Sequence, residues 1–399
     1  MATFANKLKG FNVMRLEKSM VADSYPLKHL WSGHSAEEVA RAMNLQVKEA
    51  SETTPLYAED PASSAWLRYG FARIMDALPF MEIEWEDDSE FDPADTVFHA
   101  LDNGQIFAIL ERRERILPGD TLRAEVQKEG AKLAKRQGEE LNRKQWAEIK
   151  DTVAARLLAK ALIRTRQIPV LFQRSVNDPD IYDVFYFVSS HKVVEDVNAV
   201  LFRRAFSSFP AYPFENDLTL PVKWLLTRIL KEKEGDKPWV TFQPYTSAKL
   251  VDRVSGGSAY SFKDQVLRNG KEFDPLVAEA LDQDYEVDNM SMRFWQKSPV
   301  ESALGYTTFK LNAKGVFSGI KLSDVMVAER GSVESDSAML DFNAYMFLFT
   351  DVIGDMVGYL EDLCTYFSPD HQRDDDEEGT GKVGDTETVD EEYDENDEL

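Results

Sequence analysis

The spacing of apolar residues changes in the first half of this chain, and that change limits the folds open to it. Residues Gly104–Arg112 form a short strand-like run. After the break at Leu117-Pro118-Gly119, the apolar residues recur about every 3.6 positions, which is the period of an α-helix. Strand-like sequence returns at Ile168–Gln173 and Tyr182–Val188. The chain therefore places a helical segment between strands.

This helical segment divides into two helices. The first is expected over residues 120–137, because Asp120 or Thr121 can cap its start. Gly138 then permits a turn. Asn142 can start a second helix, which we expect to continue through about Gln167, just before Pro169.

The same segment is the basic part of an otherwise acidic protein. The 399 residues contain 46 Lys and Arg against 71 Asp and Glu, a net charge of -25. Residues Arg112–Arg174 nevertheless carry 16 basic residues and 8 acids, whereas Asp76–Glu111 holds 11 acids and neither Lys nor Arg. A local patch, not the total charge, decides whether a phosphate backbone is attracted within a Debye length. The basic segment is therefore a candidate nucleic-acid surface.

Long flexible cations suit a sequence-neutral contact with phosphates, and both helices supply them. Four cations of the first helix fall within one arc of about 100° on a helical wheel. The second helix has a packing stripe that includes Trp146, with cations around the rest. The candidate phosphate contacts are Lys128, Lys132, Lys135, Arg136, Arg143, Lys144, Lys150, Arg156, Lys160 and Arg164.

The same residues also fit a solvated helical pair without a ligand. Carboxylates lie three or four positions from several of the cations, as in Glu129 with Lys132 and Lys144 with Glu148. Such pairs stabilise exposed helices by themselves. Taken alone, the charge pattern leaves both interpretations open.

Outside this segment, strands and helices are mixed without a regular strand–helix alternation. Helices are expected over about 35–47, 191–207, 222–231, 274–281 and 341–363. Strands are expected at Phe11–Glu17, Trp66–Arg73, Phe80–Trp85, Trp239–Gln243, Ala259–Leu267, Tyr285–Trp295, Tyr306–Leu311 and Val316–Leu322. The pattern predicts an α+β fold with mixed, largely antiparallel sheets and a protruding basic helical pair.

We expect four parts along the chain. Residues 1–111 form the N-terminal α+β part of the body, 112–167 a basic helical arm, 168–368 an α+β body with a C-terminal apolar helix, and 369–399 an acidic tail. From Asp370 to Leu399 there are 15 acids and two basic residues, with almost no large aliphatic residue. Such a segment is expected to be disordered, since it cannot bury enough apolar surface to offset its ordering entropy.

The acidic tail has three possible roles. Its carboxylates can imitate a row of phosphates and compete with DNA for the basic helices, which is the hypothesis we favour. It can also be a solubilising appendage or a bait for a basic partner.

The composition excludes several classes of protein. A single cysteine, Cys364, rules out a disulfide framework and a multi-cysteine metal centre. No apolar run approaches the roughly 20 residues of a membrane span, and no Gly-rich phosphate loop is present. We therefore expect a cytoplasmic protein with no membrane partner and no cofactor.

Short motifs spread over about residues 4–365 occur in a set order. They are FNVMRLE at 11–17, NGQI at 103–106, ILP at 116–118, residues 203–213 ending in PAYP, LTLPVKW at 218–224, KDQVL at 263–267, MSMRFW at 290–295 and the apolar segment 341–363. A long Lys/Glu/Ala-rich helical stretch follows the third of these. The order and spacing of the motifs resemble those of the RdgC family of bacterial recombination-associated proteins.

The resemblance implies a ring-shaped homodimer with double-stranded DNA in its basic hole, bound with little sequence preference. It places one contact between the two protomers at Lys263, Asp264 and Gln265. It also implies that the protein limits the access of a RecA-type recombinase by occupying the duplex. Such a protein would be associated with the nucleoid.

Two other functions remain to be weighed. A metal-dependent DNA exonuclease needs several carboxylates around Mg²⁺ and commonly a lysine. Pro179-Asp180 offers one carboxylate, but the Glu148-Ile-Lys150 sequence lies in the predicted second helix and precedes it. We therefore expect binding without catalysis. The other alternative is an acidic protein-interaction or DNA-mimic module.

Overall fold

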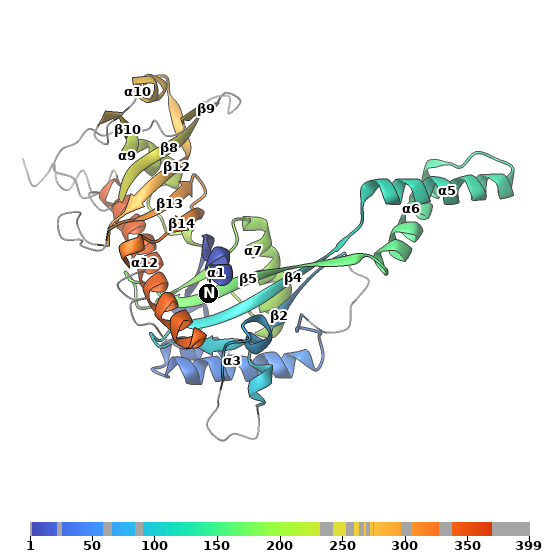
Figure 1. The fold of residues 1–399 in the computed structure, drawn as a ribbon, viewed down its shortest axis with the longest axis horizontal. Helices are drawn as coiled ribbons and strands as arrows, with labels where there is room; N and C mark the ends of the chain where they lie inside the picture. Colours follow the sequence, from blue (N-terminus) through green and yellow to red (C-terminus); the bar gives the residue numbers. More distant parts are fainter. Residues whose placement is uncertain are drawn as a thin grey trace, which may run out of the picture.

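The computed structural model describes residues 2–21, 26–58, 66–83, 91–231, 242–252, 259–262, 267–268, 272–273, 275–296, 305–326 and 337–368. Helices and antiparallel strands are mixed along these residues, which confirms the predicted α+β fold class. Figure 1 shows a body built on one long sheet and a helical pair that projects from it.

The first half of the sheet contains the N-terminal strand. Its strands are β1 (Gly10–Glu17), β2 (Leu67–Ala72), β3 (Phe98–Ala100), β4 (Ile106–Ile116), β5 (Leu162–Arg174), β6 (Ile181–Tyr186) and β7 (Tyr212–Pro213). In space they follow the order β2-β4-β5-β6-β1, with β3 beside β4 and β7 beside β1. All of these ladders are antiparallel.

The second half of the sheet continues from the other edge of β1. Its strands are β8 (Phe242–Asp252), β9 (Ala259–Phe262), β12 (Tyr285–Phe294), β13 (Thr307–Asn312) and β14 (Phe317–Lys321), in the order β14-β13-β12-β8-β9. Only Gly10 and Phe11 of β1 pair with β14. A Cβ at Gly10 would lie 2.8 Å from the carbonyl oxygen of Phe317, so the join requires glycine. The short strands β10 (Leu267–Arg268) and β11 (Glu272–Phe273) pair separately.

Helices cover both faces of the first half of the sheet. One core holds Phe107 and Ile109 of β4 with the helices α1 (Ala2–Ala5) and α12 (Ala338–Tyr366). It continues into the second half, where α9 (Val222–Lys231) and α10 (Pro275–Asp282) pack on β12. The other core holds Ala108 and Leu110 with α3 (Ala36–Ser51), α7 (His191–Val197) and α8 (Arg203–Ala205). Since successive strand residues point to opposite faces, burial on both faces gives β4 its continuous apolar run. The short helices α2 (Lys18–Val21) and α4 (Ile74–Ala77) complete the body.

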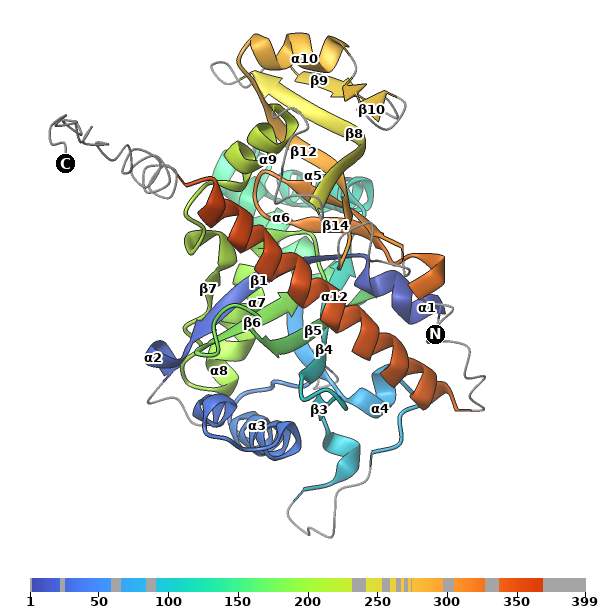
Figure 2. The same cartoon turned by 90° about the vertical axis from the view of Figure 1, so that its left-hand side faces the viewer.

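The long helix α12 packs directly against the sheet, as Figure 2 shows. Its Gly354 and Gly358 face Gln173 and Asn177, and a Cβ on either glycine would crowd those side chains. The Asn177 amide donates to the Gly358 carbonyl at 3.0 Å. Small residues on α12 therefore permit its close approach to the end of β5. No helix of the described residues is long and apolar enough to span a bilayer.

A buried arginine joins α12 to the strands beneath it. The Arg15 guanidinium of β1 donates to Asp183 of β6 at 3.0 Å, to Asp217 at 2.9 Å and to both oxygens of Glu361 on α12 at 2.9 Å. It also lies over the Phe214 ring, 4.6 Å from the centroid. Removing one partner of such a buried cluster leaves uncompensated charge, which typically costs about 3–5 kcal/mol. The cluster therefore fixes where α12 docks.

Several local predictions are confirmed. Ser35 and Glu38 form the capping box that begins α3. The predicted helix after Pro221 is α9, and the turn before β14 has Gly315 at φ +70°. In each case the signal is local, because a cap or a turn depends on residues a few positions apart.

The strand predicted at Phe80–Trp85 is wrong over the described part, residues 80–83. These residues make a turn and an irregular segment. Met81 is buried, and Phe80 and Ile83 pack on the α12 side of the sheet without a partner strand. The apolar alternation that suggested a strand is therefore explained by packing alone.

The second predicted helix is too long. It is α6 (Arg143–Leu158), and the chain then enters β5 at Leu162. Residues Leu162–Phe172 pair with β4 without interruption, from Ile116 opposite Leu162 to Ile106 opposite Phe172. Cross-strand hydrogen bonds outweigh the helical preference of this charged stretch, which a single-sequence pattern could not reveal. Arg164 therefore lies on a strand.

Candidate nucleic-acid interface

Residues 112–167, which we call the arm, carry the predicted phosphate contacts. Figure 1 shows β4 and β5 leaving the body as a ribbon that ends in two packed helices, α5 (Gly119–Gln137) and α6. The two strands stay paired as far as Ile116 and Leu162, at the foot of the helices. The arm is thus an extension of the main sheet.

Arg115 connects the ribbon to the helical pair. Its guanidinium donates to the carbonyl oxygens of Leu158 at 2.7 Å and Ala159 at 3.5 Å, at the end of α6. A cation in this position satisfies carbonyls that have no partner within the helix and complements the helix dipole. Arg115 is 9% exposed, so it serves the structure of the arm and is not a surface contact.

The helices α5 and α6 pack through a small residue against a large one. Gly130 of α5 is buried beneath the Trp146 ring of α6, and a Cβ at Gly130 would collide with that ring. Trp146 is still 38% exposed, so it is only partly a packing residue. Gly138 ends α5 at φ +72°, and Asn142 begins α6 with a capping box. The predicted turn and the predicted start of α6 are thus confirmed. The predicted cap of the first helix is wrong, because α5 begins at Gly119, after Pro118, and no side chain caps it.

Three of the ten predicted contacts form ion pairs within the arm. Arg156 of α6 reaches Glu125 of α5 at 3.1 Å and Glu129 at 3.6 Å. The same carboxylates accept Lys128 at 3.4 Å and Lys132 at 3.0 Å. Hydrogen bonds from Lys132 lower the pKa of Glu129, so the carboxylate stays ionised. For these three cations, the structure matches the solvated, ion-paired interpretation.

The other predicted contacts are exposed and form no ion pair within the described residues. They spread over the outer surfaces of both helices and onto β5, so they face solvent on several sides of the arm. They are Lys135, Arg136, Arg143, Lys144, Lys150, Lys160 and Arg164. Cations without internal partners remain available to an external anion.

The two strands of the ribbon, β4 and β5, add arginines to the cations of the arm. A helical wheel could not place these arginines on a common face, because they lie on strands. Arg112 lies on β4, and Arg166 lies directly opposite it on β5. Once residues 162–167 are read as a strand, alternate positions share one face, which places Arg164 and Arg166 side by side on it. The sequence pattern predicted a helix at these positions, so the grouping of these arginines follows only from the strand register.

A groove runs between α5 and α6, but its lining has mixed charge. It has a volume of about 510 Å³ and is lined by Lys132, Arg136 and Arg156 together with Glu129 and Glu148. A phosphate row entering the groove would meet carboxylates as well as cations. The outer surfaces of the arm fit a phosphate backbone better than the groove does.

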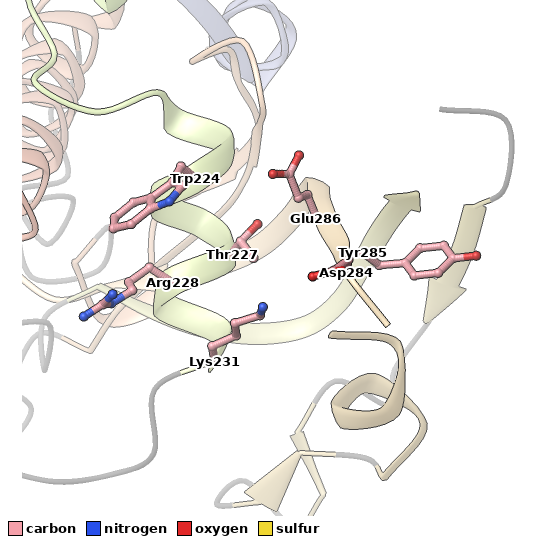
Figure 3. A pocket seen from close by; sticks show the side chains of 7 residues that line it. All are labelled: Trp224, Thr227, Arg228, Lys231, Asp284, Tyr285 and Glu286. Carbon is pink, nitrogen blue, oxygen red and sulfur yellow. The ribbon is translucent and has the colours of Figure 1, made fainter. Parts of the chain in front are cut away.

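A smaller pocket lies in the other half of the molecule, between α9 and the start of β12. Figure 3 shows Thr227 and Lys231 of α9 pointing toward Glu286 and Asp284, whereas Trp224 and Arg228 extend from the other side of the helix. Its volume is about 200 Å³, and the Arg228 guanidinium lies 5.5 Å from the centroid of the Trp224 ring. Cations and acids balance in this pocket, so it has no preference for an anion.

The predicted protomer contact at Lys263, Asp264 and Gln265 lies outside the described residues, as does the acidic tail from residue 369. The nuclease candidates come from different parts of the molecule. Asp180 lies between β5 and β6 and pairs with Lys18, whereas Glu148 lies on α6 of the arm. In the described part of the chain, no three His, Cys, Asp or Glu side chains are grouped to hold a metal ion.

The environment of Cys364 is not that of a catalytic nucleophile. It is buried in α12 and donates from its thiol to the Leu220 carbonyl. Burial raises its pKa to about 12. A thiol held protonated in this way is a packing residue and not a nucleophile.

Comparison with known proteins identifies a family that this chain resembles. A family model described as "Putative exonuclease, RdgC" matches residues 91–367, which is more than half of the chain and includes the whole arm. The "Recombination-associated protein RdgC" of Shewanella sp. (strain ANA-3) is 26% identical over 201 residues, covering 50% of this chain and 60% of the relative.

The protein of the same name from Yersinia enterocolitica is 24% identical over 264 residues, covering 66% of this chain and 78% of the relative. The matched part thus spans about 60% of the length of the first curated relatives. The family match, with the sheet-borne arm it covers, shows that this chain belongs to the RdgC family.

Proposed function

We propose that this protein binds double-stranded DNA without sequence preference through the cations of its arm. The observation that carries the proposal is the set of exposed arm cations that have no ion-pair partner among the described residues, on an element that projects from the body. Phosphate contacts carry no base information, so binding through them is sequence-neutral. The acidic remainder of the molecule confines DNA to the arm.

DNA held in this way is withheld from other proteins. We propose that the protein occupies duplex DNA, limits the access of a RecA-type recombinase, and so modulates recombination in the nucleoid. The printed name of the relatives, a recombination-associated protein, supports this role. A homodimer that closes into a ring would lengthen the time on DNA, since enclosure prevents escape without requiring many tight contacts.

The proposal is one of binding and not of cleavage. A nuclease of the two-metal type requires carboxylates that converge on the metal ions. Asp180, one candidate carboxylate, pairs with Lys18 at 3.1 Å, and Glu148, another, is on the arm. The word exonuclease in the description of the family model makes nuclease activity the alternative that the experiment must exclude.

The test uses linear duplexes of three unrelated sequences, incubated with the purified protein and Mg²⁺ or Mn²⁺. The proposal predicts retarded mobility of all three, with no shortening of either strand. An arm variant, in which Lys135, Lys144, Lys150 and Lys160 are changed to Gln, should bind all three sequences more weakly by the same factor. Shortened strands would favour the nuclease, and no retardation at low salt would favour a protein-interaction module.

A further inference from the structure

The arginines on the two faces of the ribbon formed by β4 and β5 differ in whether they have partners within the protein. On one face, Arg113 donates to Glu111 at 3.0 Å, and Arg115 is capped on the end of α6. Every arginine of β4 on this face therefore has a short, well-formed partner within the protein.

On the other face, β4 and β5 carry three arginines and one carboxylate, and a second carboxylate, Asp196 of α7, lies beside Tyr69 of β2. Arg112 of β4 lies directly opposite Arg166 of β5, and Glu114 lies directly opposite Arg164. Paired residues of an antiparallel ladder point to the same face, with their Cβ atoms about 5 Å apart. Glu114, the one acid that β4 and β5 place on this face, reaches Arg112 only at 3.5 Å.

This arrangement is unfavourable for the protein alone. Like charges placed directly opposite each other destabilise a sheet. Arg164 and Arg166 are exposed, and within the described residues neither forms an ion pair. The Nε of Arg112 is buried and has no hydrogen-bond acceptor. A buried donor without an acceptor destabilises the protein, so an acceptor supplied by a ligand would be stabilising.

The row that contains these arginines continues onto β2. Tyr69 of β2 is directly opposite Arg112, so three adjacent strands present Tyr69, Arg112 and Arg166 across one face. Burial raises the pKa of Tyr69, the Arg112 guanidinium acts in the opposite direction, and the Asp196 carboxylate of α7 raises it further. The Tyr69 hydroxyl therefore stays protonated and faces groups of the protein itself, which leaves the arginines as the donors to a ligand.

We propose that Arg112 and Arg166, with Arg164 beside them, form a binding site for one phosphate group at the root of the arm. Two guanidinium groups side by side match the several oxygens of a phosphate, since each presents a planar fork of donors. The phosphate also neutralises the repulsion between the two arginines. The site rests on the proposed function, in which the phosphate belongs to a DNA backbone that passes along the arm.

The test compares three variants in titrations of a labelled duplex at low salt. Replacing both arginines (R112Q/R166Q) should weaken binding about tenfold and reduce the slope of log K against log salt by about 1. The matched control, Arg113→Gln, removes a ribbon arginine from the opposite face and should bind as the wild type does. Glu114→Gln should strengthen binding, because it removes the carboxylate that competes with phosphate.

A thermal melt separates a binding role from a structural one. If the two arginines serve a ligand, R112Q/R166Q should melt at or above the wild-type temperature, because the like-charge pair is gone. If R112Q/R166Q melts lower and binds duplex as R113Q does, the proposed site is wrong.

The outcome also separates this site from the proposed function. A wild type that binds duplex while R112Q/R166Q binds equally well overturns the site and leaves the function intact. A wild type that binds no duplex overturns the function. The site is then judged with inorganic phosphate alone. Phosphate must raise the wild-type melting temperature above that in chloride of equal ionic strength, and R112Q/R166Q must lose this effect; otherwise the site is also rejected.

Discussion

Arg15 and its three carboxylates form the most heavily buried charge cluster of the described residues. Asp183 is 3% exposed, and burial raises its pKa to about 6, with Arg15 acting in the opposite direction. Asp217 and Glu361 share the same guanidinium. Burial disfavours the charged carboxylate more strongly than Arg15 favours it, so Asp183 retains its proton to a higher pH than in the unfolded chain.

This shift predicts how stability depends on pH. Between about pH 4 and pH 6, the folded protein binds more protons at Asp183 than the unfolded chain does, so the contribution of Asp183 to the free energy of unfolding falls as pH rises. In Asp183→Asn this contribution is absent. From pH 4 to pH 6, the unfolding free energy of the wild type should therefore fall by ~2 kcal/mol relative to that of the variant.

Urea denaturation of both proteins at pH 4, 5 and 6 measures that difference directly, because all other titrating groups are common to the two chains. A difference that stays constant with pH, or that moves in favour of the wild type as pH rises, would contradict the assignment.

The sequence gives no sign of this cluster. Arg15, Asp183, Asp217 and Glu361 come from four separate segments, with Arg15 and Glu361 346 positions apart. Spacing rules detect partners that lie within a few residues on one helix or strand. Long-range partners of this kind depend on the order of strands in the sheet, which local pattern does not determine.

At the scale of elements, the packing of α5 on α6 depends on Gly130. Glycine inside a helix normally costs about 1 kcal/mol relative to alanine, so its presence there points to a close contact. That contact is the Trp146 ring, which leaves no room for a side chain at Gly130. The arm thus keeps its helices together through one small residue.

Changing Gly130 to Ala should loosen the arm and leave the body unchanged. The new methyl group displaces the Trp146 ring, and overpacking of this kind typically costs about 1–3 kcal/mol. Hydrogen exchange should become faster in α5 and α6 and stay the same in the β-sheet. Gly119→Ala is the matched control, since nothing lies within 4 Å of a Cβ at that position. Slower exchange in α5 of Gly130→Ala would mean that helix propensity, and not packing, decides.

The elements themselves were largely predictable. Caps and turns set the starts of α3, α6 and α9 and the end of α5, all of which depend on local chemistry. The end of the second arm helix was not predictable, because residues 162–167 read as a continuation of the charged helix. Their strand conformation comes from pairing with β4, more than forty positions earlier in the chain. The candidate phosphate contacts on the helices could be listed from the sequence, but the grouping of the ribbon arginines required the strand register.

At the scale of the whole molecule, the arm is basic although the protein as a whole has a net charge of -25. The acidic tail from Asp370 to Leu399 contributes 15 acids to that total. If the tail competes with DNA for the arm, as its charge suggests, truncation after Pro369 should tighten duplex binding at low salt. The effect should disappear at high salt, because screening weakens both interactions. Equal dissociation constants at matched low ionic strength would exclude the competition.

The most direct test of the account is the salt dependence of duplex binding. Each phosphate neutralised by the protein contributes about 0.9 to the slope of log K against log salt. The arm variant, with Lys135, Lys144, Lys150 and Lys160 changed to Gln, should therefore have a slope smaller than that of the wild type by about 3 to 4. A body variant that replaces the exposed Arg203, Arg204, Lys310 and Lys321 by Gln changes the net charge equally. The account predicts a wild-type slope for the body variant and a reduced slope for the arm variant. Equal slopes for the wild type and the arm variant would contradict it.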